Sequence, residues 1–173
     1  ATIMYGHIDS PKEWAVHLDI IRRIQYETGG FTEFVPLSFV HYDSPLYLEN
    51  PSEVRPGATE NEIELMHAVS RIVLNGFIDN IQVSWTKLGP KKARNLLSMG
   101  VNDLGGTLMN ESISRSAGSK NGQEITEAEM IAIIRSSSKT PIRRDTLYRT
   151  LKTYNSEESV RATDPLVPRS GTN

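Results

Sequence analysis

The order of apolar and polar positions predicts strands alternating with helices. Runs of apolar and β-branched residues predict strands over residues 2–5, 31–39, 78–85 and 101–109. Apolar side chains that recur every three or four residues predict helices over residues 11–28, 60–75 and 90–99. Strands that alternate with helices pair in parallel through right-handed crossovers, so the predicted fold class is α/β.

Capping signals locate three helix starts. A serine or threonine stands three residues before a glutamate in Ser10–Glu13, Thr59–Glu62 and Thr126–Glu129, which is the pattern of a capping box. The third box predicts a further helix after residue 126. Beyond that helix, residues 141–151 are weakly strand-like.

A long connection separates the second strand from the next helix. Residues 40–58 carry three prolines together with Tyr42, Leu46, Tyr47 and Leu48, and a free linker would not need these apolar side chains. We therefore expect an ordered flap that can close over a site.

The strand pattern fits part of a TIM-type (β/α) barrel better than a doubly wound sheet. Residues 6–10 contain no glycine-rich phosphate turn of the doubly wound type. The βα units would make up about half of an eight-stranded barrel. We expect residues 1–154 to form this C-terminal half and residues 155–173 to be a polar, disordered tail.

Composition excludes several classes of function. The 173 residues are 38% hydrophobic and 23% charged, with a net charge of −2. This net charge lacks the positive excess that binding to nucleic acid or an anionic membrane needs. No apolar run approaches the roughly 20 residues of a membrane span. The chain has no cysteine, so it cannot itself hold a thiolate-ligated zinc or iron–sulfur cluster. We expect a cytoplasmic protein.

Candidate functional residues lie where the predicted strands end, because parallel α/β folds gather their sites there. They are Tyr5, Gly6 and His7 on the first strand, Glu33, Pro36 and His41 on or after the second, Ser84, Trp85 and Lys87 on the third, and Asp103 and Thr107 on the fourth. Glu33 and Glu111 are the rim-side carboxylates.

The residues alone leave the chemistry open. His7 and His41 with Glu33 or Asp103 could bind the metal of an α/β hydrolase, or they could simply cap a loop and anchor the flap. The indole of Trp85 could stack on an anionic planar substrate or plug the rim. Gly105-Gly106 allows close backbone approach to a ligand, and it equally suits a tight turn.

Several stretches together resemble one radical S-adenosylmethionine family. They are residues 2–7 (TIMYGH), 30–41 (GFTEFVPLSFVH), 84–89 (SWTKLG), 102–109 (NDLGGTLM) and 117–118 (AG). They resemble the C-terminal half of the tyrosine-dependent component of deazaflavin (FO) synthase. Aminofutalosine synthase and futalosine cyclase of menaquinone synthesis share the general pattern of these stretches. Membership of this menaquinone branch is the alternative interpretation.

The resemblance implies a radical transferase. It implies that S-adenosylmethionine and a [4Fe–4S] cluster generate a radical, and that the 4-hydroxybenzyl group of L-tyrosine moves onto 5-amino-6-(D-ribitylamino)uracil. The partners that it implies are a ring-closing component and a reductant protein. The implied contacts to S-adenosylmethionine are Tyr5, Gly6, His7, Glu33 and Pro36. The implied substrate contacts are His41, Ser84, Trp85, Lys87, Asp103 and Thr107.

The sequence departs from the family at the cluster. The family ligates it through a Cys-x-x-x-Cys-x-x-Cys loop, and this chain has no cysteine. We therefore expect that the cluster loop lies in a preceding half of the protein and that this chain is inactive alone. An incomplete barrel also leaves unpaired sheet edges, so we expect self-association.

Overall fold

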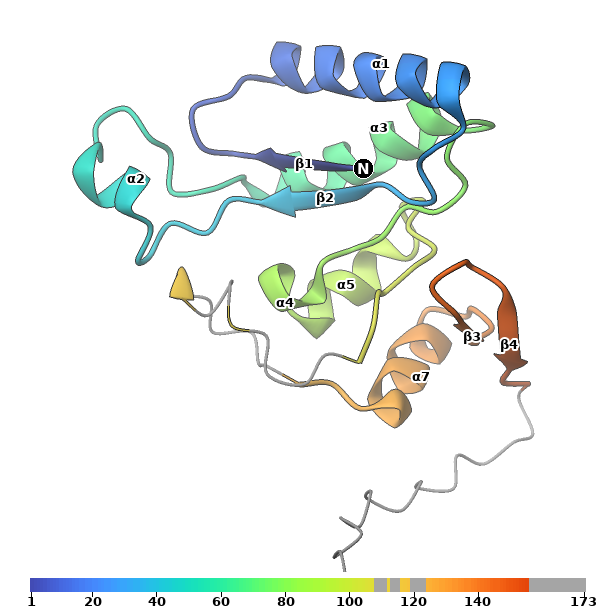
Figure 1. Ribbon diagram of the computed structural model, residues 1–173. Coiled ribbons are helices and arrows are strands. Elements are labelled where there is room, and N and C mark those ends of the chain that lie inside the picture. The colour runs from blue at the N-terminus through green and yellow to red at the C-terminus, as the bar shows by residue number, and fades with distance from the viewer. Residues whose placement is uncertain (108–111, 113–115, 119–123, 156–173) are drawn as a thin grey trace, which may run out of the picture.

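The computed structural model describes residues 1–107, 112, 116–118 and 124–155. Helices α1 (Pro11–Thr28) and α3 (Glu60–Leu74) lie side by side on one face of the parallel strands (Figure 1). The strands and helices alternate, which confirms the α/β class. Glu111 and the tail from residue 156 onward fall outside the described residues.

The parallel sheet is short and open. Strands β1 (Thr2–Tyr5) and β2 (Val35–Ser38) pair in parallel, with Thr2 opposite Val35 and Tyr5 opposite Ser38. Single parallel bridges, Phe34 with Ile81 and Gln82 with Asp103, continue the sheet. The strands predicted at 78–85 and 101–109 are therefore reduced to bridges, and the described residues form no closed barrel.

Proline 36 explains why the ladder beyond β2 is so short. The amides of Val35 and Phe39 donate to β1, to the carbonyls of Ala1 and Tyr5 at 2.9 Å. The amide of Phe34 points the other way and donates to Asn80. The backbone nitrogen of Pro36 faces the same neighbour as that of Phe34, but it carries no hydrogen to donate. Pairing toward residue 81 therefore stops after one bridge.

Four of the predicted helices form, and three of them begin at the predicted capping boxes. They are α1, α3, α5 (Pro90–Leu96) and α7 (Glu127–Ser136), with two short helices, α2 (Pro45–Glu49) and α4 (Trp85–Leu88). In α3 the hydroxyl of Thr59 accepts from the amide of Glu62, and Thr126 does the same for Glu129 in α7. These contacts satisfy amides that have no partner within the helix.

The core lies between the sheet and its helices. Ile3 and Tyr5 of β1 and Phe34, Ile81 and Val83 of the neighbouring segments are buried toward α1 and α3. Met4, which points to the opposite face, is 54% exposed. Because side chains alternate along a strand, Gln82 and its partner Asp103 lie on the same face as Met4. We call this the inner face.

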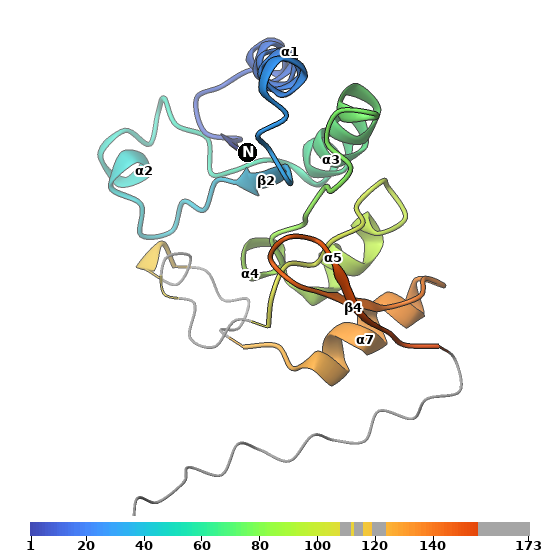
Figure 2. The same ribbon diagram turned by 45° about the vertical axis from the view of Figure 1, so that its right-hand side comes forward.

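A β-hairpin follows α7. Strands β3 (Ile142–Arg144) and β4 (Thr150–Thr153) are antiparallel and lie close to α7 (Figure 1), and Figure 2 shows β4 beside α7 from another side. The hairpin closes with the amide of Tyr154 donating to the carbonyl of Pro141 at 3.0 Å, and the Tyr154 hydroxyl donates to Glu127 of α7. In the described part of the chain, no helix has the length and apolarity needed to cross a membrane.

The connection from residue 40 to 58 is ordered, as its apolar side chains predicted. It contains α2, it buries Val54, and the amide of Arg55 donates to the carbonyl of His7 at 2.9 Å. The amide of Asp43 also donates to the carbonyl of Ala117. The flap is therefore held at both ends beside the carboxyl end of the sheet.

Candidate functional site

A pocket of about 330 Å³ lies at the carboxyl end of β2. Its wall includes His41 from the flap, Lys87 of α4 and Lys92 of α5, with Phe39 and Ile63 as apolar lining. The structure thus brings His41 and Lys87 together, as the strand-end argument predicts. Lys92 was not among the predicted site residues. It lies after Lys87 in the sequence, and the helix-breaking Gly89-Pro90 pair separates the two lysines.

Aromatic rings and basic groups give this pocket its chemical character. The imidazole of His41 stacks on Tyr42 with ring centres 4.2 Å apart and meets the ring of Tyr47 at 5.0 Å. The ammonium of Lys92 pairs with Glu60 at the start of α3. Two lysines beside aromatic rings favour a ligand that carries both an anionic group and a ring.

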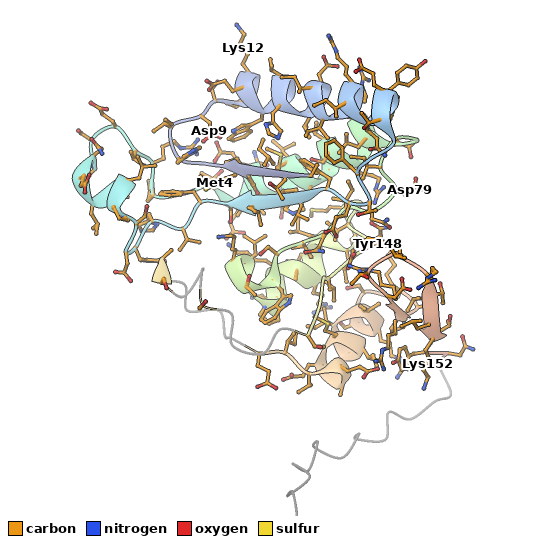
Figure 3. The ribbon with its side chains drawn as sticks, in the orientation of Figure 1. Met4, Asp9, Lys12, Asp79, Tyr148 and Lys152 are labelled. Carbon is orange, nitrogen blue, oxygen red and sulfur yellow. The ribbon has the colours of Figure 1, made fainter. Side chains whose placement is uncertain are left out.

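The loop after β1 is built around Asp9, which the sequence reasoning did not single out. Its carboxylate accepts from the amide of Gly6 at 3.0 Å and of His7 at 2.8 Å, and it also contacts the imidazole of His7 and the indole N–H of Trp14 (Figure 3). Burial alone would raise the pKa of Asp9, but these donors hold it below its ordinary value.

Gly6 is required where this loop passes the flap. Its φ is +88°, and a Cβ built there would lie 2.4 Å from the amide nitrogen of Ala58. His7 lies beside the ring of Phe39 at 5.6 Å. Gly6 and His7 therefore sit at the carboxyl end of β1, in the position expected for them.

Tyr5 is not a rim residue. Its side chain is fully buried on the helix-facing side of β1, edge-on to Trp14 with ring centres 5.5 Å apart. Burial, reinforced by the charges of Glu62 and Asp9, raises the pKa of its hydroxyl well above the ordinary value. Because side chains alternate along a strand, a position at the strand end can still face the core, and the side chain of Tyr5 does so.

Ser84 and Trp85 begin α4 instead of ending a strand. The hydroxyl of Ser84 lies 3.1 Å from that of Thr86. Trp85 is 4% exposed, and its indole N–H donates to the carbonyl of Gly106 at 3.3 Å. Of the two predicted roles, the ring therefore fills the core and does not offer a stacking surface.

Pro36 and Glu33 do not lie at the carboxyl rim either. Pro36 is fully buried within β2, opposite Ile3. Glu33 precedes β2, at the amino end of the sheet, so its predicted rim position is wrong. The strand was expected to run from residue 31 to 39, whereas β2 begins only at Val35, so Glu33 lies before it.

A second polar centre joins Glu33 and Asp103 on the inner face. Glu33 accepts from the amide group of Gln82 at 2.9 Å and from the hydroxyl of Tyr148. Asp103 is buried and accepts from Arg144 and Tyr148 of the hairpin. Arg144 and Tyr148 carried no sequence signal, because both belong to a segment more than 40 residues from Asp103.

Thr107 is exposed, and it follows the turn at Gly105, whose φ is +76°. Residues with a side chain rarely adopt this φ, so the turn favours glycine, and a Cβ there would also lie 3.0 Å from the side-chain oxygen of Gln82. Glu111, the other predicted carboxylate, is outside the described residues.

His7 and His41 do not form a metal site. Each ring packs in its own aromatic pair, His7 with Phe39 and His41 with Tyr42. Over the described ranges there is no group of three or more histidine, aspartate and glutamate side chains that could hold a metal ion. The metal-hydrolase alternative therefore has no support in this geometry.

Comparison with known proteins gives a consistent result. Residues 28–157 match the family described as the CofH/MqnC C-terminal region. The chain is 51% identical over 153 residues to 5-amino-6-(D-ribitylamino)uracil--L-tyrosine 4-hydroxyphenyl transferase of Methanopyrus kandleri, which covers 88% of this chain and 41% of that protein. It is 50% identical over 151 residues to the transferase of the same name from Methanothermobacter thermautotrophicus, covering 87% of this chain and 41% of that protein.

A longer relative matches over the same region. The chain is 52% identical over 148 residues to FO synthase of Mycobacterium leprae, covering 86% of this chain and 17% of that protein. The chain therefore spans about two fifths of the archaeal relatives' length and a smaller share of the mycobacterial one. These names agree with the deazaflavin branch of the predicted resemblance and not with its menaquinone branch.

Proposed function

This chain belongs to the CofH/MqnC C-terminal region family, and from that premise we propose that it is the substrate-facing part of a tyrosine-dependent transferase. The transferase moves the 4-hydroxybenzyl group of L-tyrosine onto 5-amino-6-(D-ribitylamino)uracil, toward the deazaflavin chromophore. The observation that carries this proposal is about 50% identity, over nearly the whole chain, to proteins named for this reaction. Residues 1–154 then form the C-terminal portion of a (β/α) barrel.

The iron–sulfur cluster of the proposed enzyme cannot be held by this chain. A [4Fe–4S] cluster needs thiolate ligands, and no cysteine is present. The cluster and S-adenosylmethionine supply the radical chemistry of the family, with ligands from elsewhere in the full-length protein. A reductant protein and a ring-closing component are the proposed partners.

The contribution of this chain is to bind and orient substrates at the carboxyl end of the sheet. Gly6 and His7 are the proposed contacts to the nucleoside of S-adenosylmethionine. The pocket beside β2 suits L-tyrosine, because Lys87 and Lys92 offer cations to a carboxylate and Phe39 offers an apolar surface to a ring. The flap from residue 40 to 58 forms one wall of the pocket and limits access of water, which a radical reaction requires.

An anaerobic assay of the full-length enzyme with L-tyrosine and the diaminouracil tests the function. We expect consumption of L-tyrosine and formation of the coupled product, and intact L-tyrosine would reject the proposal. A futalosine-type substrate in the same assay tests the menaquinone alternative, which predicts turnover of that substrate instead.

The pocket is tested by Lys87→Met, with Lys91→Met as the matched control. Lys91 is exposed on α5 and does not line the pocket. Loss of a hydrogen bond to a charged group predicts a rise of about tenfold or more in KM for L-tyrosine in the Lys87 variant. Equal KM values in both variants would exclude Lys87 from substrate binding.

A further inference from the structure

The polar cluster on the inner face lies outside the pocket. It comprises Glu33, Asp103, Arg144 and Tyr148. The guanidinium of Arg144 donates from Nε and Nη2 to one oxygen of Asp103 at 2.9 and 2.5 Å. Tyr148 donates to the same oxygen at 2.6 Å, and its ring lies 4.0 Å from the guanidinium carbon of Arg144. The hairpin thus reaches Asp103 with two side chains that also support each other.

Tyr148 is held in an unfavourable backbone conformation to make this contact. Its φ is +62°, a region that side-chain-bearing residues seldom adopt. Asp145 supports the turn, because its side chain accepts from the amides of Leu147 and Arg149 at 2.9 Å and its carbonyl accepts from the amide of Tyr148. Strain of this kind persists only where the surroundings fix it, and it is concentrated at functional sites.

The hydroxyl of Tyr148 remains a proton donor at neutral pH. Burial, followed by the hydrogen bonds to Asp103 and Glu33, raises the pKa of Tyr148 well above its ordinary value. Figure 3 shows Tyr148 where the connection between β3 and β4 approaches the parallel segments. Its single proton is shared between the carboxylates of Asp103 and Glu33, so Tyr148 makes a charge-assisted contact with both.

The other oxygen of Asp103 controls the turn that follows it. It accepts from the amide of Gly105 at 2.7 Å. On the far side of the turn, the carbonyl of Gly106 accepts from Trp85 at 3.3 Å. One carboxylate therefore connects the hairpin to residues 105–107, the loop at the end of the fourth parallel segment.

We propose that Arg144 and Tyr148 are positioning residues that act through Asp103 to hold the loop of residues 105–107 in its substrate-binding conformation. The substrate part rests on the proposed function, since it is the resemblance to this transferase family that implies a substrate contact for Thr107. The conformational part rests on the hydrogen bonds alone. The hairpin is then a structural support for the site and not an appended element.

Amide hydrogen exchange on this chain tests the conformational part. Tyr148→Phe and Arg144→Met should each raise the exchange rate of the Gly105 amide by about tenfold, the effect of one lost hydrogen bond. Tyr154→Phe and Arg143→Met are matched controls on the same hairpin. Arg143 is 61% exposed and lies 3.9 Å from Glu127, and neither control residue contacts Asp103.

Exchange of the Tyr154 amide shows whether the hairpin is still folded. If Arg144→Met unfolds it, Tyr148→Phe decides the question, because that change removes one oxygen atom. An unchanged Gly105 amide in Tyr148→Phe would overturn the proposal.

Kinetics of the full-length enzyme test the substrate part. The two variants should raise KM for L-tyrosine or the diaminouracil by about tenfold with little change in kcat, whereas the controls keep both constants. Unchanged KM values together with faster Gly105 exchange would reject the substrate role and retain the loop support. If no form of the enzyme consumes L-tyrosine while Gly105 exchange still rises, the proposed function fails and the conformational part stands.

Discussion

At the scale of single residues, two carboxylates organise the loops at the sheet, the partly buried Asp9 and the buried Asp103. Asp9 gathers donors from Gly6, His7 and Trp14, and Asp103 joins Arg144 and Tyr148 to Gly105. The set around Asp9 is local, because all of its members lie between Gly6 and Trp14, so spacing alone could have suggested it. The set around Asp103 could not be predicted, because its members meet only after α7 and the hairpin have packed.

Asp9→Asn should destabilise the protein by about 1.5–3 kcal/mol at pH 7, the range for hydrogen bonds to a charged group. An asparagine turns an N–H₂ group toward donors that need an acceptor. The folded-state pKa of Asp9 lies below its ordinary value of 3.8, so its charge contributes stability that is present above about pH 4. That contribution is lost as the pH falls through the folded-state pKa.

Urea unfolding of the wild type and of Asp9→Asn at a series of pH values measures this contribution. The difference between wild type and Asp9→Asn should be constant above about pH 5 and shrink below pH 3.8. Subtraction removes the contributions of the other carboxylates, which titrate in both proteins. A difference that is independent of pH would show that the charge of Asp9 is not what holds the loop.

At the scale of elements, helices could be predicted and strand lengths could not. A capping box and an apolar stripe are local, and all three boxes form in the structure. A strand over residues 78–85 would have to pair with the segment of Phe34 and β2. Pro36 prevents that pairing beyond Phe34. For the same reason Trp85, expected at a strand end, begins a helix and is buried.

Thr59→Ala should weaken α3 at its first turn. Its hydroxyl accepts from the amide of Glu62, and the carboxylate of Glu62 accepts in return from the amide of Thr59 and from Arg55. Loss of the cap predicts a cost of about 1 kcal/mol, or a fall of roughly 3 °C in Tm. Thermal unfolding measures it, and Thr59→Ser, which keeps the hydroxyl, should match the wild type. Equal losses in both variants would contradict the capping role.

At the scale of the whole molecule, the sheet has an open edge at β1. The carbonyls of Ala1 and Tyr5 face β2, so those of Thr2 and Met4 point outward. Among the described residues the outer edge of β1 pairs with no strand, and His17 reaches the carbonyl of Thr2 at 3.0 Å. An open edge beside exposed apolar side chains is a surface for association with another strand.

The 173-residue chain should therefore self-associate, with Met4 at the contact. Met4 lies on β1 with its side chain on the inner face, where it is 54% exposed (Figure 3). Met4→Lys places a charge beside the open edge, and a charge at an edge opposes strand addition. Val69→Lys is the control, because Val69 is 40% exposed and belongs to α3, not to the edge strand. Sedimentation velocity over a concentration series should show association of the wild type and of Val69→Lys, and a monomer for Met4→Lys. A wild type that stays monomeric at every concentration would contradict the prediction, and equal association of all three proteins would place the contact elsewhere.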